Sequence, residues 1–484
     1  MSLTRPRSDI QTPLRNTIRV IAICLTWLAL KPAPVAAANP PHLEWTRTQG
    51  TSARDAAIDI AADSLGNVFV AGDTSGPLSG SSLGASDAFL TRYDSSGDRK
   101  WTINIGSNKN DVGYGVSIDN LGSAYVAGGI NGSYGLVDQA TADAFVYKYD
   151  VNGNQTWART FGTSTTDEAR DVVGDSSGNV FVAGLTLGNL AGTNAGNADV
   201  FVSKFNAQGD QLWTRQIGSN QFDGVFAAAT DAPGNVFVVG STYGSFGGPN
   251  PGTLEDVFVA KFDASGNHLW TRQFGNSGQQ FGDGVVVDAT GNIYIAGGTS
   301  GSWGGPAGGD GNATNPYDGY LMKLDSNGNQ QWLRQFGGHS YDSAGAVTLD
   351  SLGNVYVVGH SNSNLPGTDA DGSDAFVMKF TPTGDLQWTT QAGPPGSDAG
   401  GAIASDGGGN LYTAGSIFRG TMFTPFDDDA FAAKISLVPE PTSLTLLFPF
   451  LIYSTLRRRS KWKVEMPVLE DVYRTQVGGT LSAR

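Results

Sequence analysis

Residues 171–213, DVVGDSSGNVFVAGLTLGNLAGTNAGNADVFVSKFNAQGDQLW, contain the unit from which most of the chain is built. Four short apolar segments, at 172–175, 180–184, 199–205 and 212–215, are separated by turns and loops rich in Gly, Asn, Asp and Ala. The continuous apolar run VFVAG is typical of a strand that is covered on both faces. No segment has a helical period, and the glycines disfavour helix throughout. The unit is therefore predicted to form four β-strands.

This unit recurs seven times. Its tryptophan returns with spacings of 56, 56, 56, 57, 62 and 56 residues, at Trp45, Trp101, Trp157, Trp213, Trp270, Trp332 and Trp388. The second expected strand recurs at 68–72, 124–128, 180–184, 236–240, 293–297, 355–359 and 411–415. The third recurs at 87–92, 143–148, 199–204, 256–261, 318–323, 374–379 and 429–434. So regular a period over nearly the whole chain predicts one large repeat domain rather than several domains.

The two ends of the repeat region complement each other. The seventh unit stops after its third strand, around Ile435, and the first tryptophan strand, at 43–48, precedes any complete unit. The N-terminal strand can therefore complete the last sheet and remove the open edges of the ring. The predicted fold is all-β, a seven-bladed β-propeller with four antiparallel strands per blade over residues 39–437.

Three motifs carry a family resemblance. They are GNVxVxG at the second strand, DAFVxK at the third and GxxxWTRxxG around the tryptophan. With these motifs, residues 43–435 resemble the SBBP repeats of bacterial secreted proteins, and the resemblance implies the same seven-bladed propeller.

Residues 1–38 are predicted to be a secretory signal peptide. Arg5, Arg7, Arg15 and Arg19 give a basic start, an apolar run of eleven residues follows at 20–30, and 36–38 are three alanines. This order is typical of a cleaved signal, and eleven apolar residues are too few to span a bilayer. An uncleaved anchor is the alternative.

The C-terminal end is predicted to be a second sorting segment, at 438–463, followed by a tail at 464–484. The motif Pro439-Glu440-Pro441 precedes an apolar stretch at 444–456 and a basic cluster that includes Arg457, Arg458 and Arg459. This order resembles the PEP-CTERM sorting signal of Gram-negative bacteria. The resemblance implies export, recognition by an exosortase and transient insertion of a short transmembrane helix. The basic cluster would stay cytoplasmic, which places the repeats outside the cell.

Charge is distributed unevenly along the chain. The tails (1–38 and 441–484) hold 12 of the 30 Lys and Arg but only 4 of the 45 Asp and Glu, so the repeats carry a net charge of −23. A surface this acidic repels phosphate backbones, so we expect no nucleic-acid partner. Solubility outside the cell accounts for the charge, and binding of Ca²⁺ or of a cationic ligand is the sharper alternative. The single cysteine, Cys24, lies in the signal, so no disulfide is expected.

The residues that repeat in every unit are interpreted as scaffold. We expect each tryptophan to pack against a neighbouring blade, where burial of its ring stabilises the fold. We expect the repeated carboxylates to accept hydrogen bonds in turns and between blades. They are Asp55, Asp111, Asp167, Asp223, Asp342 and Asp398, with Gln280 in the fifth unit, and Asp63, Asp119, Asp175, Asp231, Asp288, Asp350 and Asp406. The basic residue that ends each third strand should pair with a nearby carboxylate; these are Arg92, Lys148, Lys204, Lys261, Lys323, Lys379 and Lys434.

The loops between the second and third strands vary most, and variable loops on a rigid scaffold are where binding is usually found. The fifth, at 299–317, is the longest. In it, Trp303 and Tyr317 could stack on a sugar, and Asp310 with Asn312 could contact a cation.

Three classes of function stay open. The first is a non-catalytic binding module on the cell surface or in the extracellular matrix, with a polysaccharide or a surface protein as its partner. The second is a structural matrix component without a small ligand. The third is an enzyme, because GxxxW also resembles the tryptophan docking motif of quinoproteins, which normally have eight blades. The four histidines have no metal-ligand spacing, and no catalytic Ser/His/Asp order or phosphate loop occurs. We therefore expect no catalytic residues and no cofactor, with Ca²⁺ as the weak exception.

Overall fold

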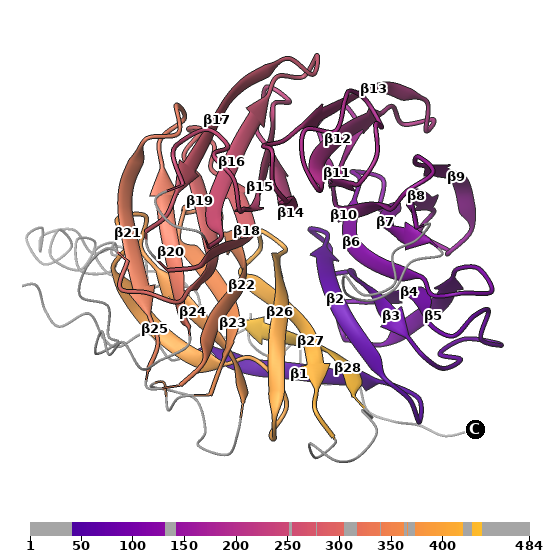
Figure 1. Cartoon of the computed structure of the whole chain (residues 1–484). Helices are drawn as coiled ribbons and strands as arrows, with labels where there is room; N and C mark the ends of the chain where they lie inside the picture. Colours follow the sequence, from indigo (N-terminus) through magenta and orange to yellow (C-terminus); the bar gives the residue numbers. More distant parts are fainter. Residues whose placement is uncertain are drawn as a thin grey trace, which may run out of the picture. The chain divides into compact units, whose positions relative to one another are not determined.

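The computed structural model of the chain describes residues 41–437 except 131–141, 251–253, 277, 304–316, 339, 363–364, 366–372 and 420–427. Within these residues the chain forms 28 β-strands in seven four-stranded antiparallel sheets and no helix. The sheets are arranged around a common centre, and we letter them as blades A to G in chain order (Figure 1). The predicted seven-bladed propeller is therefore confirmed.

Each blade is listed here from its innermost strand outwards. Blade A holds β2 (Asp55–Ala62), β3 (Val68–Thr74), β4 (Asp87–Tyr93) and β5 (Arg99–Ile105); blade B holds β6 (Val112–Ile118), β7 (Ala124–Ile130), β8 (Asp143–Tyr149) and β9 (Gln155–Phe161). Blade C holds β10 (Asp167–Gly174), β11 (Val180–Thr186), β12 (Asp199–Phe205) and β13 (Gln211–Ile217); blade D holds β14 (Asp223–Thr230), β15 (Val236–Thr242), β16 (Asp256–Phe262) and β17 (His268–Phe274). Blade E holds β18 (Gln280–Val287), β19 (Ile293–Thr299), β20 (Asp318–Leu324) and β21 (Gln330–Phe336); blade F holds β22 (Asp342–Leu349), β23 (Val355–Ser361), β24 (Asp374–Phe380) and β25 (Leu386–Gln391). Blade G holds β26 (Asp398–Ser405), β27 (Asn410–Ile417), β28 (Asp429–Ser436) and β1 (His42–Gln49).

Blade G closes the ring as the sequence predicts. Its strand order is β1-β28-β27-β26, so the first strand of the described chain is the outermost strand of the last blade. His42 lies opposite Ser436 and Gln49 lies opposite Ala430. The described chain therefore begins and ends on one face of the ring, beside the turn that joins β26 to β27.

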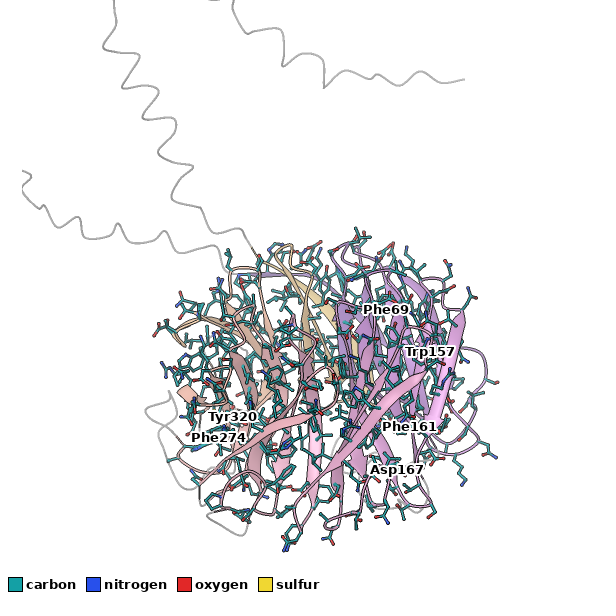
Figure 2. The ribbon with its side chains drawn as sticks, turned by 90° about the horizontal axis from the view of Figure 1, so that it is seen from above. Phe69, Trp157, Phe161, Asp167, Phe274 and Tyr320 are labelled. Carbon is teal, nitrogen blue, oxygen red and sulfur yellow. The ribbon has the colours of Figure 1, made fainter. Side chains whose placement is uncertain are left out.

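The ring has two unlike faces. The tight-turn face carries the short turns that follow the first and third strands, and the loop face carries the longer connections between the second and third strands. Figure 2 shows Trp157 toward one face and Asp167 toward the other. In the tight turns the strand-end carboxylates work as predicted: Asp175, for example, accepts hydrogen bonds from the backbone N–H groups of Ser177 and Asn179 at 2.9 Å each.

The repeated tryptophans join neighbouring blades. Trp213 of blade C donates a hydrogen bond from Nε1 to the carbonyl oxygen of Ala264 in blade D at 3.3 Å. Its ring lies on Gly266, whose φ of 79° is available to glycine at little cost and where a Cβ atom would be 2.7 Å from the indole. Arg215 lies over the same ring, 5.5 Å from its centroid, and donates to the Gly266 carbonyl oxygen at 2.7 Å. The predicted packing between blades is confirmed.

The repeated acid at the start of each inner strand closes the preceding turn on the loop face. Asp223 accepts a hydrogen bond from the backbone N–H of Ser219 at 2.5 Å. In blade E, Gln280 takes the same place, and its Oε1 accepts from the backbone N–H of Asn276 at 3.0 Å. An amide can fill the site because what the turn requires is a hydrogen-bond acceptor.

Of the basic residues that end the third strands, Lys148, Lys204 and Lys261 pair with the strand-end carboxylates of their own blades at 2.9, 3.4 and 3.8 Å. Lys434 pairs instead with Glu44 of the closing strand at 2.9 Å. The expected ion pairs therefore form at these four positions, and in blade G the pair helps to hold β1 against β28.

No helix of the described residues is long and apolar enough to cross a membrane. The predicted signal at 1–38, the motif Pro439-Glu440-Pro441, the apolar stretch at 444–456 and the cluster Arg457, Arg458 and Arg459 all lie outside the described residues. Their assignment stays a prediction.

Candidate functional site: the central channel

Every innermost strand contains a β-bulge at the same place. In blade A, for example, Ala57 pairs with Gly72 and Asp59 pairs with Ala71, which leaves Ile58 as the extra residue. The seven extra residues, which we call the bulge ring, are Ile58, Tyr114, Arg170, Phe226, Asp283, Gly345 and Gly401. A bulge breaks the alternation of a strand and aims its extra side chain away from the sheet. Here it aims one residue from each blade into the centre of the molecule.

A glycine near the loop-face end of each second strand makes this bulge sterically allowed. A Cβ atom on Gly297 of blade E would collide with the backbone carbonyl oxygen of Phe281, and the equivalent glycines of the other six blades would collide with an inner-strand carbonyl oxygen in the same way. The repeated VxVxG pattern therefore has a backbone role, since only glycine lets the bulged strand approach so closely.

All seven residues of the bulge ring line one cavity of about 870 Å³ along the centre of the molecule. Further lining comes from the loop-face ends of the strands, where Arg54, Tyr341, His360 and Phe418 surround the opening. Two aromatic side chains of the lining stay open to solvent: Phe226 is 38% exposed and Phe418 is 42% exposed. Gly345 and Gly401 contribute no side chain to the lining, and their backbones approach closely, because a Cβ atom on Gly345 would be 2.9 Å from the Gly401 carbonyl oxygen.

On the side formed by blades A to C, which we call the paired side, the two arginines that line the cavity each have a carboxylate partner, whereas Asp59 and Asp171 pair with no cation among the described residues. Arg170 pairs with Glu168 at 2.5 Å and lies over the ring of Tyr114, 4.3 Å from its centroid. Arg54 pairs with Asp73. Burial raises the pKa of Glu168, and Arg170 opposes that shift. Each arginine on this side is therefore already committed to a carboxylate of the protein.

Blades D to F form the opposite side, which we call the acidic side. Asp283 lines the cavity there, and Glu255, which precedes β16 and is not part of the lining, is near enough for its charge to act on Asp283. Neither carboxylate has an arginine partner of the kind found on the paired side. Among the described residues neither Glu255 nor Asp283 forms an ion pair with Lys or Arg. Glu255 accepts only weak hydrogen bonds, from Ser241 Oγ and Gln279 Nε2 at 3.4 Å each, besides a bond from the Tyr243 hydroxyl. Asp283 accepts no hydrogen bond from the described part of the chain.

Aromatic rings form a row along the acidic side. The ring centroids of Phe281 and Tyr317 are 5.8 Å apart, and those of Tyr317 and Tyr341 are 5.2 Å apart. Tyr341 is in turn stacked on His360, with centroids 5.4 Å apart and an interplanar angle of 18°. These rings come from blades E and F and lie next to the two unpartnered carboxylates.

Burial disfavours the ionised form of the carboxylic acids in the channel and so raises their pKa values. It raises the pKa of Asp283 to about 7, and the charge of Glu255 adds to that shift. It also raises the pKa of Asp59 to about 6 and that of Asp171 well above its usual range. Asp59 and Asp171 differ from Asp283 because each accepts two backbone N–H bonds, one of them from the next blade: from Val116 and from Ala228, at 2.7 Å each.

Of the residues predicted for the fifth loop, the structure describes Trp303 and Tyr317, and they pack against different residues. Trp303 packs edge-on against Tyr320 inside blade E, with centroids 4.9 Å apart, and its backbone N–H donates to Gln335 Oε1 at 2.7 Å. Tyr317 belongs to the aromatic row of the acidic side. Asp310 and Asn312 lie outside the described residues.

The sequence does contain a pattern that indicates the bulge ring. It lies in the inner strands, so a comparison of the loops alone does not reveal it. In the inner strands, residues 55–63, 111–119, 167–175, 223–231, 280–288, 342–350 and 398–406 align as nine-residue segments that begin with Asp or Gln and end with Asp. Their fourth residue is Ile, Tyr, Arg, Phe, Asp, Gly and Gly in turn. A position that changes so widely between otherwise similar strands could have been singled out before the structure was known.

In the described ranges, no group of three or more His, Cys, Asp or Glu side chains is placed to hold a metal ion. The chemistry that the channel offers there is stacking on aromatic faces, hydrogen bonding and carboxylates without a cation, which are Asp59, Asp171 and Asp283.

Comparison with known families supports the repeat assignment. A family model described as the SBBP beta-propeller repeat matches residues 44–79, 269–302 and 331–366. Three stretches of the repeat region therefore match this family model. These matches fall on units that the tryptophan spacing had already separated, including the N-terminal strand that closes blade G.

Two curated proteins are similar over longer stretches. The regulatory protein FlaEY of Caulobacter vibrioides is 26% identical over 273 residues, which is 51% of this chain and 28% of FlaEY. The uncharacterized WD repeat-containing protein L264 of Acanthamoeba polyphaga mimivirus is 21% identical over 512 residues, which is 80% of this chain and 36% of L264. The chain therefore spans about a third of the length of these relatives.

Solved structures with a similar chain trace share little sequence. A polysaccharide lyase of family PL25, an ulvan lyase, is 12% identical with a TM-score of 0.46, covering 81% of this chain and 96% of the lyase. YCF48 bound to D1 peptide is 10% identical with a TM-score of 0.46, covering 84% and 99%. Puromycin hydrolase is 12% identical with a TM-score of 0.44, covering 78% and 52%.

Proposed function

We propose that this protein is an exported, non-catalytic binding module that takes up a polysaccharide segment at the loop-face opening of its central channel. The observation that carries the proposal is the bulge ring: where the scaffold repeats seven times, the residues aimed into the channel all differ except for two glycines. Residues that repeat serve the ring, so specificity belongs to the positions that differ.

The form of the channel suits a sugar. Its volume of about 870 Å³ lies within the range of roughly 300–1,000 Å³ that is usual for small-molecule sites. Phe226 and Phe418 expose flat apolar faces, on which the C–H groups of a pyranose ring can stack.

Export is part of the proposal and rests on the two ends of the sequence. The basic, apolar and small-residue order of 1–38 and the Pro-Glu-Pro, apolar and basic order of 438–463 are the patterns of a signal peptide and of an exosortase substrate. A location at the cell surface or in the matrix would bring the channel to secreted polysaccharide.

Binding of the purified full chain to a panel of immobilised glycans, with and without Ca²⁺, tests the function. We expect saturable binding of one glycan class, and a loss of at least about tenfold in affinity for Phe226→Ala and for Phe418→Ala, because each removes an exposed aromatic face. The control is Leu212→Ala, which shortens an exposed aliphatic side chain on the outer strand β13. Binding that survives both phenylalanine substitutions would place the ligand elsewhere.

Two other results would replace the proposal. If no glycan binds but the chain is retained in isolated matrix, the scaffold role is supported instead. If a bound glycan is shortened, as measured by new reducing ends, the protein is an enzyme.

A further inference from the structure

We propose that the acidic side of the channel is a site for a protonated amine, so that the ligand is a glycan with free amino groups, such as a de-N-acetylated hexosamine polymer. This inference rests on the proposed glycan-binding function and assigns the chemical class of its ligand. It follows from the contrast between two carboxylates that lack a cation and the arginines across the channel, which already have carboxylate partners.

Asp283 is the centre of the site. The bulge of β18 aims it into the channel, and no donor from the described residues satisfies its oxygens. A carboxylate held in a partly desolvated place without a partner costs free energy, which a ligand can recover by supplying a positive charge and N–H donors. An ammonium group supplies both.

Glu255 adds a second negative charge from the neighbouring blade D, close enough to raise the pKa of Asp283 further. Its own hydrogen bonds are long, at 3.4 Å from Ser241 and from Gln279. The two carboxylates repel each other while the site is empty, and a cation between or beside them removes that repulsion. The acidic side therefore gains more from a cationic ligand than a single carboxylate would.

The walls around Asp283 favour an organic cation. Phe226 is the preceding member of the bulge ring, and Tyr341 lies close enough for the Asp283 charge, after burial, to raise the pKa of its phenol. Aromatic faces attract ammonium groups and pack on the carbon atoms that carry them. Calcium requires six to eight oxygen ligands, and no group of three or more ligating side chains exists among the described residues.

An anionic sugar fits this channel poorly. Arg170 is paired with Glu168 at 2.5 Å and Arg54 is paired with Asp73, so the positive charge that each guanidinium could offer to a uronate is already offset by a carboxylate of the protein. The remaining charges of the bulge ring and its neighbours on the acidic side are negative. Charge complementarity thus selects a basic ligand.

The test compares glucosamine and N-acetylglucosamine oligomers of equal length, measured by isothermal titration calorimetry with the full chain near pH 7, where Asp283 is partly ionised. The two ligands differ only at the nitrogen on C2, which carries an ammonium charge in glucosamine and a neutral acetamide in N-acetylglucosamine. We expect the glucosamine oligomer to bind at least about tenfold more tightly, with an affinity that falls as salt is raised. Asp283→Asn should abolish this preference, and Glu255→Gln should reduce it by a smaller factor.

The matched control is Asp98→Asn, which removes one carboxylate from an exposed turn on the tight-turn face and should leave both affinities unchanged. Melting temperatures of all variants establish that they fold. If Asp283→Asn does not fold, Glu255→Gln and Phe226→Leu carry the test, since both lie on the acidic side and keep the backbone unchanged.

The outcomes separate the two proposals. If both oligomers bind equally and Asp283→Asn changes neither, the amine site is overturned and glycan binding stands. If neither oligomer nor any other glycan binds, the proposed function fails as well. An oligolysine that binds more tightly than the glucosamine oligomer would overturn the glycan and make a basic peptide the ligand.

Discussion

The paired and acidic sides of the channel are built from the same kinds of strand, bulge and turn. They differ in whether the charged residue at the bulge has a partner of opposite charge. On the paired side, Arg170 and Glu168 sit two residues apart on one strand and neutralise each other. On the acidic side, Asp283 occupies the position equivalent to Arg170, and no basic residue among the described residues forms an ion pair with it. The comparison teaches that a symmetric scaffold can hold an asymmetric site, because one bulge position per blade is free to vary.

The largest loss of stability should come from removing the contact between blades C and D, where the paired and acidic sides meet. Trp213 of blade C packs on Gly266 of blade D, at the border of the paired and acidic sides. Trp213→Ala should lower the free energy of unfolding by about 3–5 kcal/mol, because a large ring and its hydrogen bond are lost. Chemical denaturation measures this, and an unchanged midpoint would contradict the packing role.

Removing one partner of the Arg170–Glu168 ion pair should lower the free energy of unfolding nearly as much as Trp213→Ala does. Arg170→Met leaves the Glu168 carboxylate, whose side chain is 2% exposed, without its cation, and we expect a loss of about 3 kcal/mol. The double variant Glu168→Gln with Arg170→Met should recover most of the loss, since no charge then stays buried. A double variant as unstable as the single one would show that packing of Arg170 on Tyr114, rather than its charge, is what matters.

The acidic side should respond to pH. The pKa of Asp283 in the folded chain is raised to about 7, so folding binds a proton between that value and its ordinary value near 4. Stability from this group is therefore greatest in acid and is lost as the pH rises toward 7. Asp283→Asn should remove on the order of 2 kcal/mol of that pH dependence between pH 4.5 and 8.

Asp59 and Asp171 shift stability in the same direction, so the informative quantity is the difference between the variant and the wild type at each pH. Parallel stability curves for the two proteins would mean that Asp283 titrates normally.

The smallest effect is expected from Glu255→Gln, which tests the interaction between the two acids of the acidic side. Glu255→Gln removes the charge that adds to the pKa shift of Asp283, so the Asp283 pKa should fall while staying above its ordinary value, because burial is the larger cause. We expect a gain in stability at neutral pH of about 0.5 kcal/mol, half of one pKa unit or less. Carboxyl chemical shifts followed by NMR titration would measure the pKa, and a rise instead of a fall would contradict the proximity of the two acids.

Much of the scaffold could be predicted because each of its parts is local. The VxVxG strands, the Asp-centred turns and the unpaired tryptophan strand at 43–48 are visible as patterns, and ring closure follows from counting. The replacement of Asp by Gln280 correctly indicated a hydrogen-bond acceptor rather than a charge.

The channel could not be predicted in the same way. Strand alternation places Asp283 and its neighbours on alternate faces, and only the register of β18 against β19, where Gly282 and Gly284 face consecutive partners, turns Asp283 toward the centre. The meeting of Glu255 with Asp283 depends on the packing of blade D against blade E, which no local pattern encodes. Tyr317 was singled out as a loop residue, but its place in a row with Tyr341 also depends on the tertiary fold.

The closure of blade G has a consequence for the order of assembly. Strand β1 is synthesised first among the 28 strands, but its partner β28 is synthesised last, since His42 pairs with Ser436. Until β28 has been synthesised, β1 has no strand to pair with and blade G lacks its outermost strand. The final step of folding must therefore join segments nearly four hundred residues apart. Such long-range pairing is slow. A polypeptide that crosses a membrane before it folds would therefore complete its ring only after the last blade has emerged.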